Sequence, residues 1–150
     1  MCGRRGRAIL AAAVAGVLVF SGCVESAPPR PEIQVEEAWV RAVAGTSVNT
    51  AAYMTLRNVG NAPDRLIGAR SDIARMTELH RTTIDDSGLA RMGEVDGLDV
   101  PAGGAALLEP GGFHVMLMGV GPLLEGDSVE ITLLLETSGS LDIVAEVRAF

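Results

Sequence analysis

Two histidines and a run of methionines are the residues of this sequence whose types and spacing point to chemistry. The 150-residue chain has only two histidines, His80 and His114, and six methionines. His114, Met116 and Met118 alternate with apolar residues in a segment typical of a β-strand, so their side chains should share one face. The apolar residues between them form the natural core face. We therefore expect His114 and both methionines to point toward the rim of the domain or toward solvent.

The ligand chemistry of this set suits one metal better than others. Taken singly, each residue is most simply explained as a gap-filling methionine or a surface histidine. Together they offer two imidazole nitrogens and two or more thioether sulfurs, and thioethers select Cu(I) while imidazole also binds copper readily. A zinc site would more usually recruit cysteine, a third histidine or a carboxylate, and a blue-copper site needs a thiolate. If the set binds a metal, its chemistry favours Cu(I).

Both cysteines lie in an N-terminal region that predicts export. Three arginines within residues 1–7 precede an apolar run over residues 8–20, and small residues follow, a pattern typical of a secretory signal peptide. The apolar run is shorter than the roughly 20 residues that span a bilayer. Cys23 directly after Ser21-Gly22 resembles a lipobox, in which that cysteine is diacylated and becomes the first residue of the mature chain. The alternative is cleavage nearby without a lipid.

These features divide the chain into three parts. Residues 1–22 are expected to be a lipoprotein signal peptide, 23–32 a lipidated anchor with a stiff proline-rich spacer, and 33–150 a single β domain. Cys2 then leaves with the signal peptide and Cys23 carries the lipid, so the folded domain keeps no thiolate for metal, redox or nucleophilic work. We expect an extracytoplasmic protein anchored to the cell membrane, on its periplasmic or cell-surface side.

The charge of the chain argues against nucleic acid as a partner. The formal net charge is −7, and removal of the signal peptide takes away three arginines and no acidic residue. A surface this acidic repels phosphate backbones. The Gly-Gly pairs precede no helix start and so indicate hairpin turns rather than phosphate cradles, and no serine has the neighbours of a catalytic nucleophile. We expect a protein that is not an enzyme.

Short apolar runs separated by Gly, Pro, Asn and Asp clusters predict an all-β domain. Turns recur about every ten residues, which favours a Greek-key sandwich or barrel. The segment 71–80 is ambiguous, because its apolar spacing would also suit a short helix. We expect strands at residues 33–40, 50–58, 65–70, 77–83, 90–95, 105–108, 113–119, 128–136 and 141–147.

Eleven residues separate His80 from Met92, twenty-one separate Met92 from His114, and one separates His114 from Met116. This joint spacing resembles the signature of the PCu(A)C family of periplasmic copper chaperones. The resemblance extends over nearly the whole mature domain. The segments that look like family segments are Ala38-Trp39-Val40-Arg41, residues 51–58, Glu78-Leu79-His80 and residues 108–119, which include Pro110-Gly111-Gly112-Phe113-His114.

This resemblance implies both a fold and a function. The fold would be a cupredoxin-like Greek-key β-sandwich or barrel, with His80, Met92, His114 and Met116 holding one Cu(I) near an exposed edge. The function would be delivery of copper to the binuclear site of cytochrome c oxidase subunit II, directly or together with a Sco-type copper protein. Arg81 stands where the family often has methionine, but as the next residue along a strand it faces away from His80.

Two other interpretations remain open at this stage. A surface-anchored β-sandwich module that binds protein or glycan could carry incidental methionines and have no metal role. A cupredoxin electron carrier is opposed by the missing thiolate. Met76 and Met118 could supply further sulfurs, although packing is the simpler explanation for each.

Overall fold

The computed structural model describes residues 28–45 and 49–149, and every regular element in that part of the chain is a β-strand. The all-β expectation is confirmed, and each of the nine expected strands corresponds to an observed one. The tenth is a three-residue strand that the sequence did not reveal, and the ambiguous segment contains a turn followed by a strand rather than a helix. The strands are β1 Ile33–Arg41, β2 Asn49–Asn58, β3 Asp64–Arg70, β4 Met76–Ile84, β5 Ala90–Glu94, β6 Leu98–Val100, β7 Ala105–Leu108, β8 Phe113–Met118, β9 Ser128–Leu135 and β10 Gly139–Arg148.

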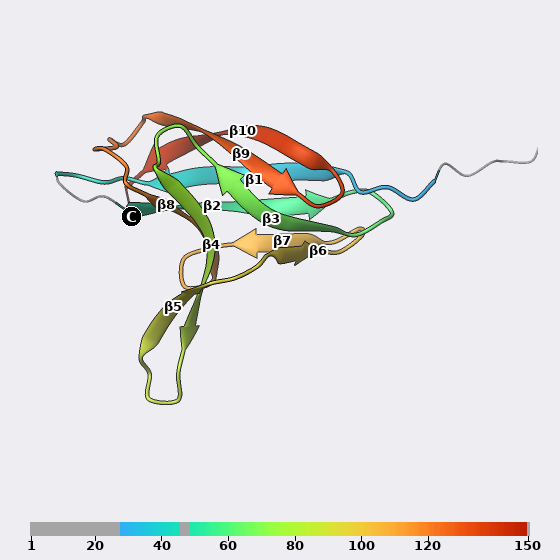
Figure 1. Ribbon diagram of the computed structural model, residues 1–150, viewed down its shortest axis with the longest axis horizontal. Coiled ribbons are helices and arrows are strands. Elements are labelled where there is room, and N and C mark those ends of the chain that lie inside the picture. The colour runs from blue at the N-terminus through green and yellow to red at the C-terminus, as the bar shows by residue number, and fades with distance from the viewer. Residues whose placement is uncertain (1–27, 46–48, 150) are drawn as a thin grey trace, which may run out of the picture.

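The strands hydrogen-bond in one continuous order that folds over itself into two layers (Figure 1). That order is β5-β4-β8-β7-β2-β1-β10-β9-β3-β6, with a further pairing of β8 to β2. Most neighbours are antiparallel, whereas β1 and β10 run parallel. Buried aliphatic side chains from both layers form one core, which burial of apolar surface stabilises. Its fully buried members include Val40, Leu56, Leu66, Val115, Leu117, Ile131, Leu133 and Val147.

A β-bulge in β1 changes which side chains of that strand face the core. The register with β2 shifts by one residue between Glu36 and Trp39, and Glu37 adopts a φ of 53°. Before the bulge Val35 packs against the core, and after it Val40 does, although the two are five residues apart. Because side chains alternate along a strand, the extra residue switches the parity and moves Trp39 to the opposite face.

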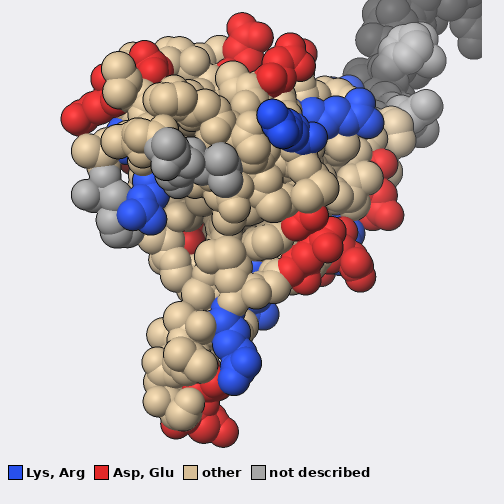
Figure 2. All heavy atoms as spheres, turned by 60° about the vertical axis from the view of Figure 1, so that its left-hand side comes forward, with Lys and Arg blue, Asp and Glu red and all other residues tan. Residues whose placement is uncertain are grey.

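The outer part of the β4–β5 hairpin projects from the sandwich as an arm, which we define as residues 82–92. The register of β4 with β8 ends at Arg81, so beyond that residue β4 pairs only with β5. Figures 1 and 2 show the arm standing away from the body, with acidic side chains at its tip. The exposed apolar residues on it are Ile84, Leu89 and Met92.

The expected signal peptide and lipidated cysteine fall within residues 1–27, outside the residues that the structure describes. Within the described part of the chain, no helix has the length and apolar character needed to cross a membrane. The proline-rich spacer enters the described residues at Pro28 and leads directly into β1.

The bulge predicts an unusual response to substitution at Glu37. A side chain in the left-handed region costs about 1–2 kcal/mol, a strain that glycine avoids and a β-branched residue increases. Glu37→Gly should therefore raise the free energy of unfolding by ~0.5–1 kcal/mol, and Glu37→Val should lower it by about 1 kcal/mol or more. Urea denaturation of the soluble domain measures both changes. An increase in the free energy of unfolding for Glu37→Val would contradict the left-handed conformation of Glu37 in the bulge.

Candidate metal centre

The two histidines meet because β4 and β8 are neighbours with a fixed register. His80 on β4 lies directly opposite His114 on β8, and their ring centroids are 5.8 Å apart with the planes at 65°. A metal–imidazole bond is about 2.0 Å long, so two rings at this separation can share one ion. The structure therefore brings together the two residues that lie 34 positions apart in sequence.

The histidine pair continues a row of rings across four strands. On β2 the Tyr53 ring centroid lies 6.2 Å from that of His114, and on β1 the Trp39 ring centroid lies 4.6 Å from that of Tyr53. Trp39 reaches this row because the bulge turns it away from the core. The aromatic rings thus form a wall along the side of His114 that is distant from His80.

The structure corrects the expectation that His114 faces the rim or solvent. The apolar residues of β8 do form the core face, but the His114 side also lies under cover, and only 2% of its surface is exposed. Tyr53, itself buried, closes one side, and residues 41–44, at the end of β1 and just after it, line the same groove. The cause is that β8 lies between β4 and β2, so the His114 ring has the His80 ring beside it from one neighbouring strand and the Tyr53 ring from the other.

Hydrogen bonds occupy one nitrogen of each imidazole ring and leave the other without a partner. Nε2 of His80 lies 2.7 Å from Oε2 of Glu78, and Nδ1 of His114 lies 3.2 Å from the carbonyl oxygen of Gly112. Carboxylate and carbonyl oxygens only accept, so these ring nitrogens are the ones that carry hydrogen. His80 Nδ1 and His114 Nε2 are then bare lone pairs, and both are buried with no hydrogen-bond partner.

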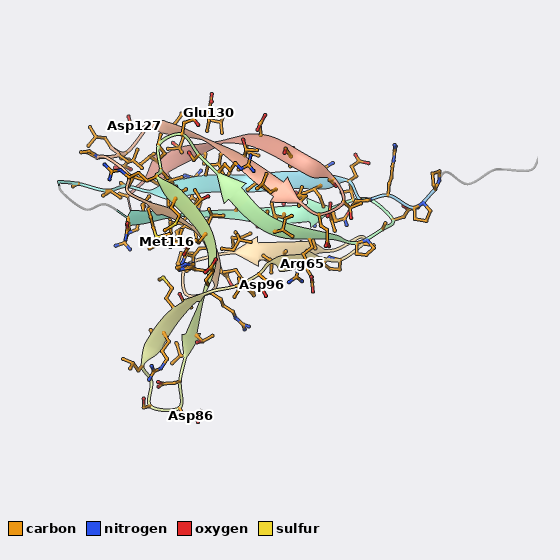
Figure 3. The ribbon with its side chains drawn as sticks, in the orientation of Figure 1. Arg65, Asp86, Asp96, Met116, Asp127 and Glu130 are labelled. Atoms are coloured by element: carbon orange, nitrogen blue, oxygen red, sulfur yellow. The ribbon has the colours of Figure 1, made fainter. Side chains whose placement is uncertain are left out.

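Two methionines lie near the histidine pair in the strand register. Met116 follows His114 on the same face of β8, and in Figure 3 it lies where the arm joins the body. Met92 on β5 is opposite Thr82, one diagonal position from His80, and diagonal neighbours of this kind are about 7–8 Å apart. Met92, His114 and Met116 line one groove of about 480 Å³. His80 is not in its lining and instead flanks it through His114.

The remaining methionines on this face lie further from the histidines. Met76 and Met118 face each other across β4 and β8, two positions beyond the pair formed by Glu78 and Met116. Met76 is 52% exposed, so its interpretation as a packing residue is wrong. Among the described residues, no three His, Cys, Asp or Glu side chains converge as a metal site. The groove beside His114 is lined instead by two methionines, Met92 and Met116.

Burial also changes the acid–base behaviour of His114. Loss of solvent around the ring lowers its pKa below the ordinary value of 6.5, and the nearby His80 lowers it further, while the hydrogen bond to Gly112 opposes the shift. A lowered pKa favours the neutral imidazole, which is the form that binds a metal.

Comparison with known proteins identifies the family. Residues 33–147 match the family described as "Putative lipoprotein LpqE-like". The chain belongs to this family, and its domain is of the PCu(A)C type. A relative from Leifsonia xyli, "Putative lipoprotein Lxx21020", is 31% identical over 96% of this chain and 92% of its own length.

Solved structures of PCu(A)C domains share the fold. Apo-DR1885 from Deinococcus radiodurans is 35% identical over 100% of this chain and 97% of its own, with a TM-score of 0.61. Its Cu(I) form is 38% identical over 83% and 81% of the two chains, with a TM-score of 0.60. The copper-bound PCu(A)C domain from PmoF2 is 28% identical over 79% and 93%, with a TM-score of 0.65. The expected cupredoxin-like fold is confirmed.

Sequence reasoning missed two residues beside the histidines. Glu78 precedes His80 by two positions in a strand, so the shared face was deducible, but nothing in the sequence indicated a hydrogen bond. Tyr53 lies in the register position of β2 that continues to His114, which required knowledge that β2 and β8 pair. No pattern in the sequence reveals that pairing.

The lowered pKa of His114 predicts how the metal-free domain responds to acid. Because the folded chain binds this proton less readily than the unfolded chain, stability is retained above about pH 6.5 and lost as the pH falls below it. In a nuclear magnetic resonance titration, the His114 ring signals should have a midpoint below 6.5, and unfolding free energy should fall over the same range. A midpoint at or above 6.5 would show that burial does not govern this ring.

Proposed function

We propose that this protein is an extracytoplasmic, non-enzymatic Cu(I) chaperone in which His80, Met92, His114 and Met116 hold one copper ion. One observation carries the proposal. Two imidazole nitrogens from facing residues are buried, lack any hydrogen-bond partner and are held as bare lone pairs by hydrogen bonds at the opposite ring nitrogens. A buried polar atom without a partner costs about 1–3 kcal/mol, which an ion bound between the two rings would recover.

The donors beside the histidines favour Cu(I) over other metals. Met116 and Met92 offer thioether sulfur, a soft ligand that zinc and magnesium rarely use. Solved PCu(A)C domains that resemble this chain include a copper-bound form and a Cu(I) form. A protein- or glycan-binding module, the alternative function, offers no reason for two paired histidines to keep free nitrogens under cover.

The ligand set suits a carrier that must release its cargo. Two neutral imidazoles and two thioethers add no negative charge, so they hold Cu(I) less tightly than a pair of thiolates would. Transfer to an acceptor that presents thiolates is then downhill. Met92 stands on the arm and is 54% exposed, so an incoming ligand could replace this sulfur before the less exposed histidines release the ion.

The acceptor that we propose is the binuclear copper site of cytochrome c oxidase subunit II, reached directly or through a Sco-type copper protein. An oxidase site at the membrane surface is best served by a donor that stays on that surface. Lipid on Cys23 would provide this anchor, and the relative from Leifsonia xyli also carries the name of a lipoprotein.

Copper binding tests the ligand set. The soluble domain should bind one Cu(I), and His114→Ala should weaken binding more than Met92→Leu, because His114 is buried and fixed while Met92 comes from the arm. Competition with a chromophoric Cu(I) chelator under anaerobic conditions measures both affinities, and X-ray absorption should show mixed nitrogen and sulfur neighbours.

Met118→Leu is the matched control for this titration, since Met118 shares the face of β8 with His114 and Met116 but lies a further step away. Its affinity should stay within about threefold of the wild type. Oxygen-only coordination, or a larger loss from Met92→Leu than from His114→Ala, would refute the site as described.

Delivery predicts a defect in respiration. A strain without this protein should have lower cytochrome c oxidase activity when copper is scarce, and the wild-type gene or added copper should restore it. The His114→Ala gene should not restore it, whereas the Met118→Leu gene should. Normal oxidase activity and copper content in the deletion strain at limiting copper would rule out this acceptor.

A further inference from the structure

Glu78 contacts one ring nitrogen of His80, and the other ring nitrogen has no hydrogen-bond partner. Its Oε2 atom is 2.7 Å from His80 Nε2, and the two side chains are 24% and 15% exposed. Both residues belong to β4 and stand two positions apart, so the regular strand places their side chains on one face. The contact is therefore built into the backbone of β4.

This hydrogen bond decides which nitrogen of His80 is available. Neutral imidazole has one N–H and one lone pair, and they exchange places between its two tautomers. A carboxylate accepts but does not donate at Nε2, so hydrogen stays on Nε2 and the lone pair stays on Nδ1. His80 Nδ1 is the buried atom without a partner. Without the carboxylate, the ring could also rotate about its Cβ–Cγ bond and exchange the positions of its nitrogens and carbons.

On the other histidine, the corresponding partner is a backbone carbonyl. The backbone carbonyl oxygen of Gly112 accepts a hydrogen bond from Nδ1 of His114, and a side-chain substitution does not remove a backbone oxygen. The side chain of Glu78 is the part of this arrangement that a mutation can change. It lies opposite Met116 in the β4–β8 pairing, so the carboxylate is also held beside the expected sulfur ligand.

We propose that Glu78 is a positioning residue that orients His80 and fixes its tautomer for Cu(I) binding at Nδ1. This inference deepens the proposed function and rests on it. Carboxylates that hydrogen-bond to metal-binding histidines restrict the ring and raise its basicity, and their loss typically lowers metal affinity 10–100-fold. Glu78 acts through His80 and need not contact the ion.

A set of substitutions separates the hydrogen bond from the charge. Glu78→Gln keeps an oxygen that accepts from Nε2 but carries no charge, whereas Glu78→Leu removes both. Glu94 is the matched control, because it is a carboxylate directly opposite His80 on β5 with no hydrogen bond to the ring. Circular dichroism confirms that each variant keeps its β structure before it is used.

The first measurement needs no copper. In the metal-free wild type, the hydrogen-bonded Nε2–H of His80 should give a downfield proton signal by nuclear magnetic resonance. That signal should persist in Glu78→Gln and Glu94→Leu and disappear in Glu78→Leu. Its absence from the wild type, or its persistence in Glu78→Leu, would overturn the proposed orientation.

The second measurement is Cu(I) affinity by chelator competition. Glu78→Leu should bind about 10–100-fold more weakly than the wild type, Glu78→Gln should lose less, and Glu94→Leu should change by less than about threefold. In a His80→Ala background, Glu78→Leu should cause no further loss, because its effect passes through the ring. Equal losses for Glu78→Gln and Glu78→Leu, or an equal loss for Glu94→Leu, would overturn the inference.

The wild-type titration separates this inference from the function beneath it. A wild type that binds no Cu(I) would refute the proposed chaperone. A wild type that binds Cu(I) while Glu78→Leu binds it equally well would leave the chaperone standing and refute only the role of Glu78.

Discussion

The antiparallel pairing of β4 with β8 is the interaction on which the rest of the site depends. Its register sets His80 against His114. A shift of one residue would carry every side chain of one strand to the opposite face and separate the imidazoles. The register is secured from the other face of the same strands, where Val115, Leu117 and Leu79 are buried in the core. Packing of aliphatic side chains on one face of β4 and β8 thus fixes the position of the histidines on the other face.

The face of β4 and β8 that carries the histidines is also restricted, because one ring nitrogen of each histidine is buried away from solvent. Each ring has a hydrogen-bond acceptor on one nitrogen and nothing on the other, an arrangement that a purely structural histidine pair would have no reason to keep. Burial lowers the pKa of His114 and so discourages a proton from filling the vacant position. The Tyr53 ring lies beside His114 and the Trp39 ring beside Tyr53, and the position of Trp39 depends on the bulge in β1.

Much of the fold followed from sequence, for identifiable reasons. Turn residues at regular intervals and alternating side chains located nine strands, and the alternation in β8 correctly assigned its core face. Three-residue β6 carries too little pattern to be recognised. The burial of His114 escaped prediction because it depends on which strands flank β8, and strand order is a long-range property that alternation within one strand does not encode. Tyr53 escaped for the same reason, whereas Glu78, two positions from His80 on the same strand, escaped because no sequence pattern indicates its hydrogen bond. The preference for Cu(I) rested on residue types, and the four expected ligands were named from the spacing that resembles the PCu(A)C signature, so neither inference needed the geometry of the site.

In the proposed site, the arm would give copper affinity a second determinant besides the ligands. Because the outer parts of β4 and β5 pair only with each other, we expect the arm to open locally without unfolding of the sandwich. An ion bound through Met92 in this proposed site would be held with the intrinsic strength of the four donors, less the free energy needed to keep the hairpin formed. Residues near the tip would then contribute to copper affinity from a distance, among them Gly88 and Asp85, which accepts hydrogen bonds from Ser87, Leu89 and Arg91. Evolution can tune how firmly such a protein holds its metal by altering a turn, while every ligand stays the same.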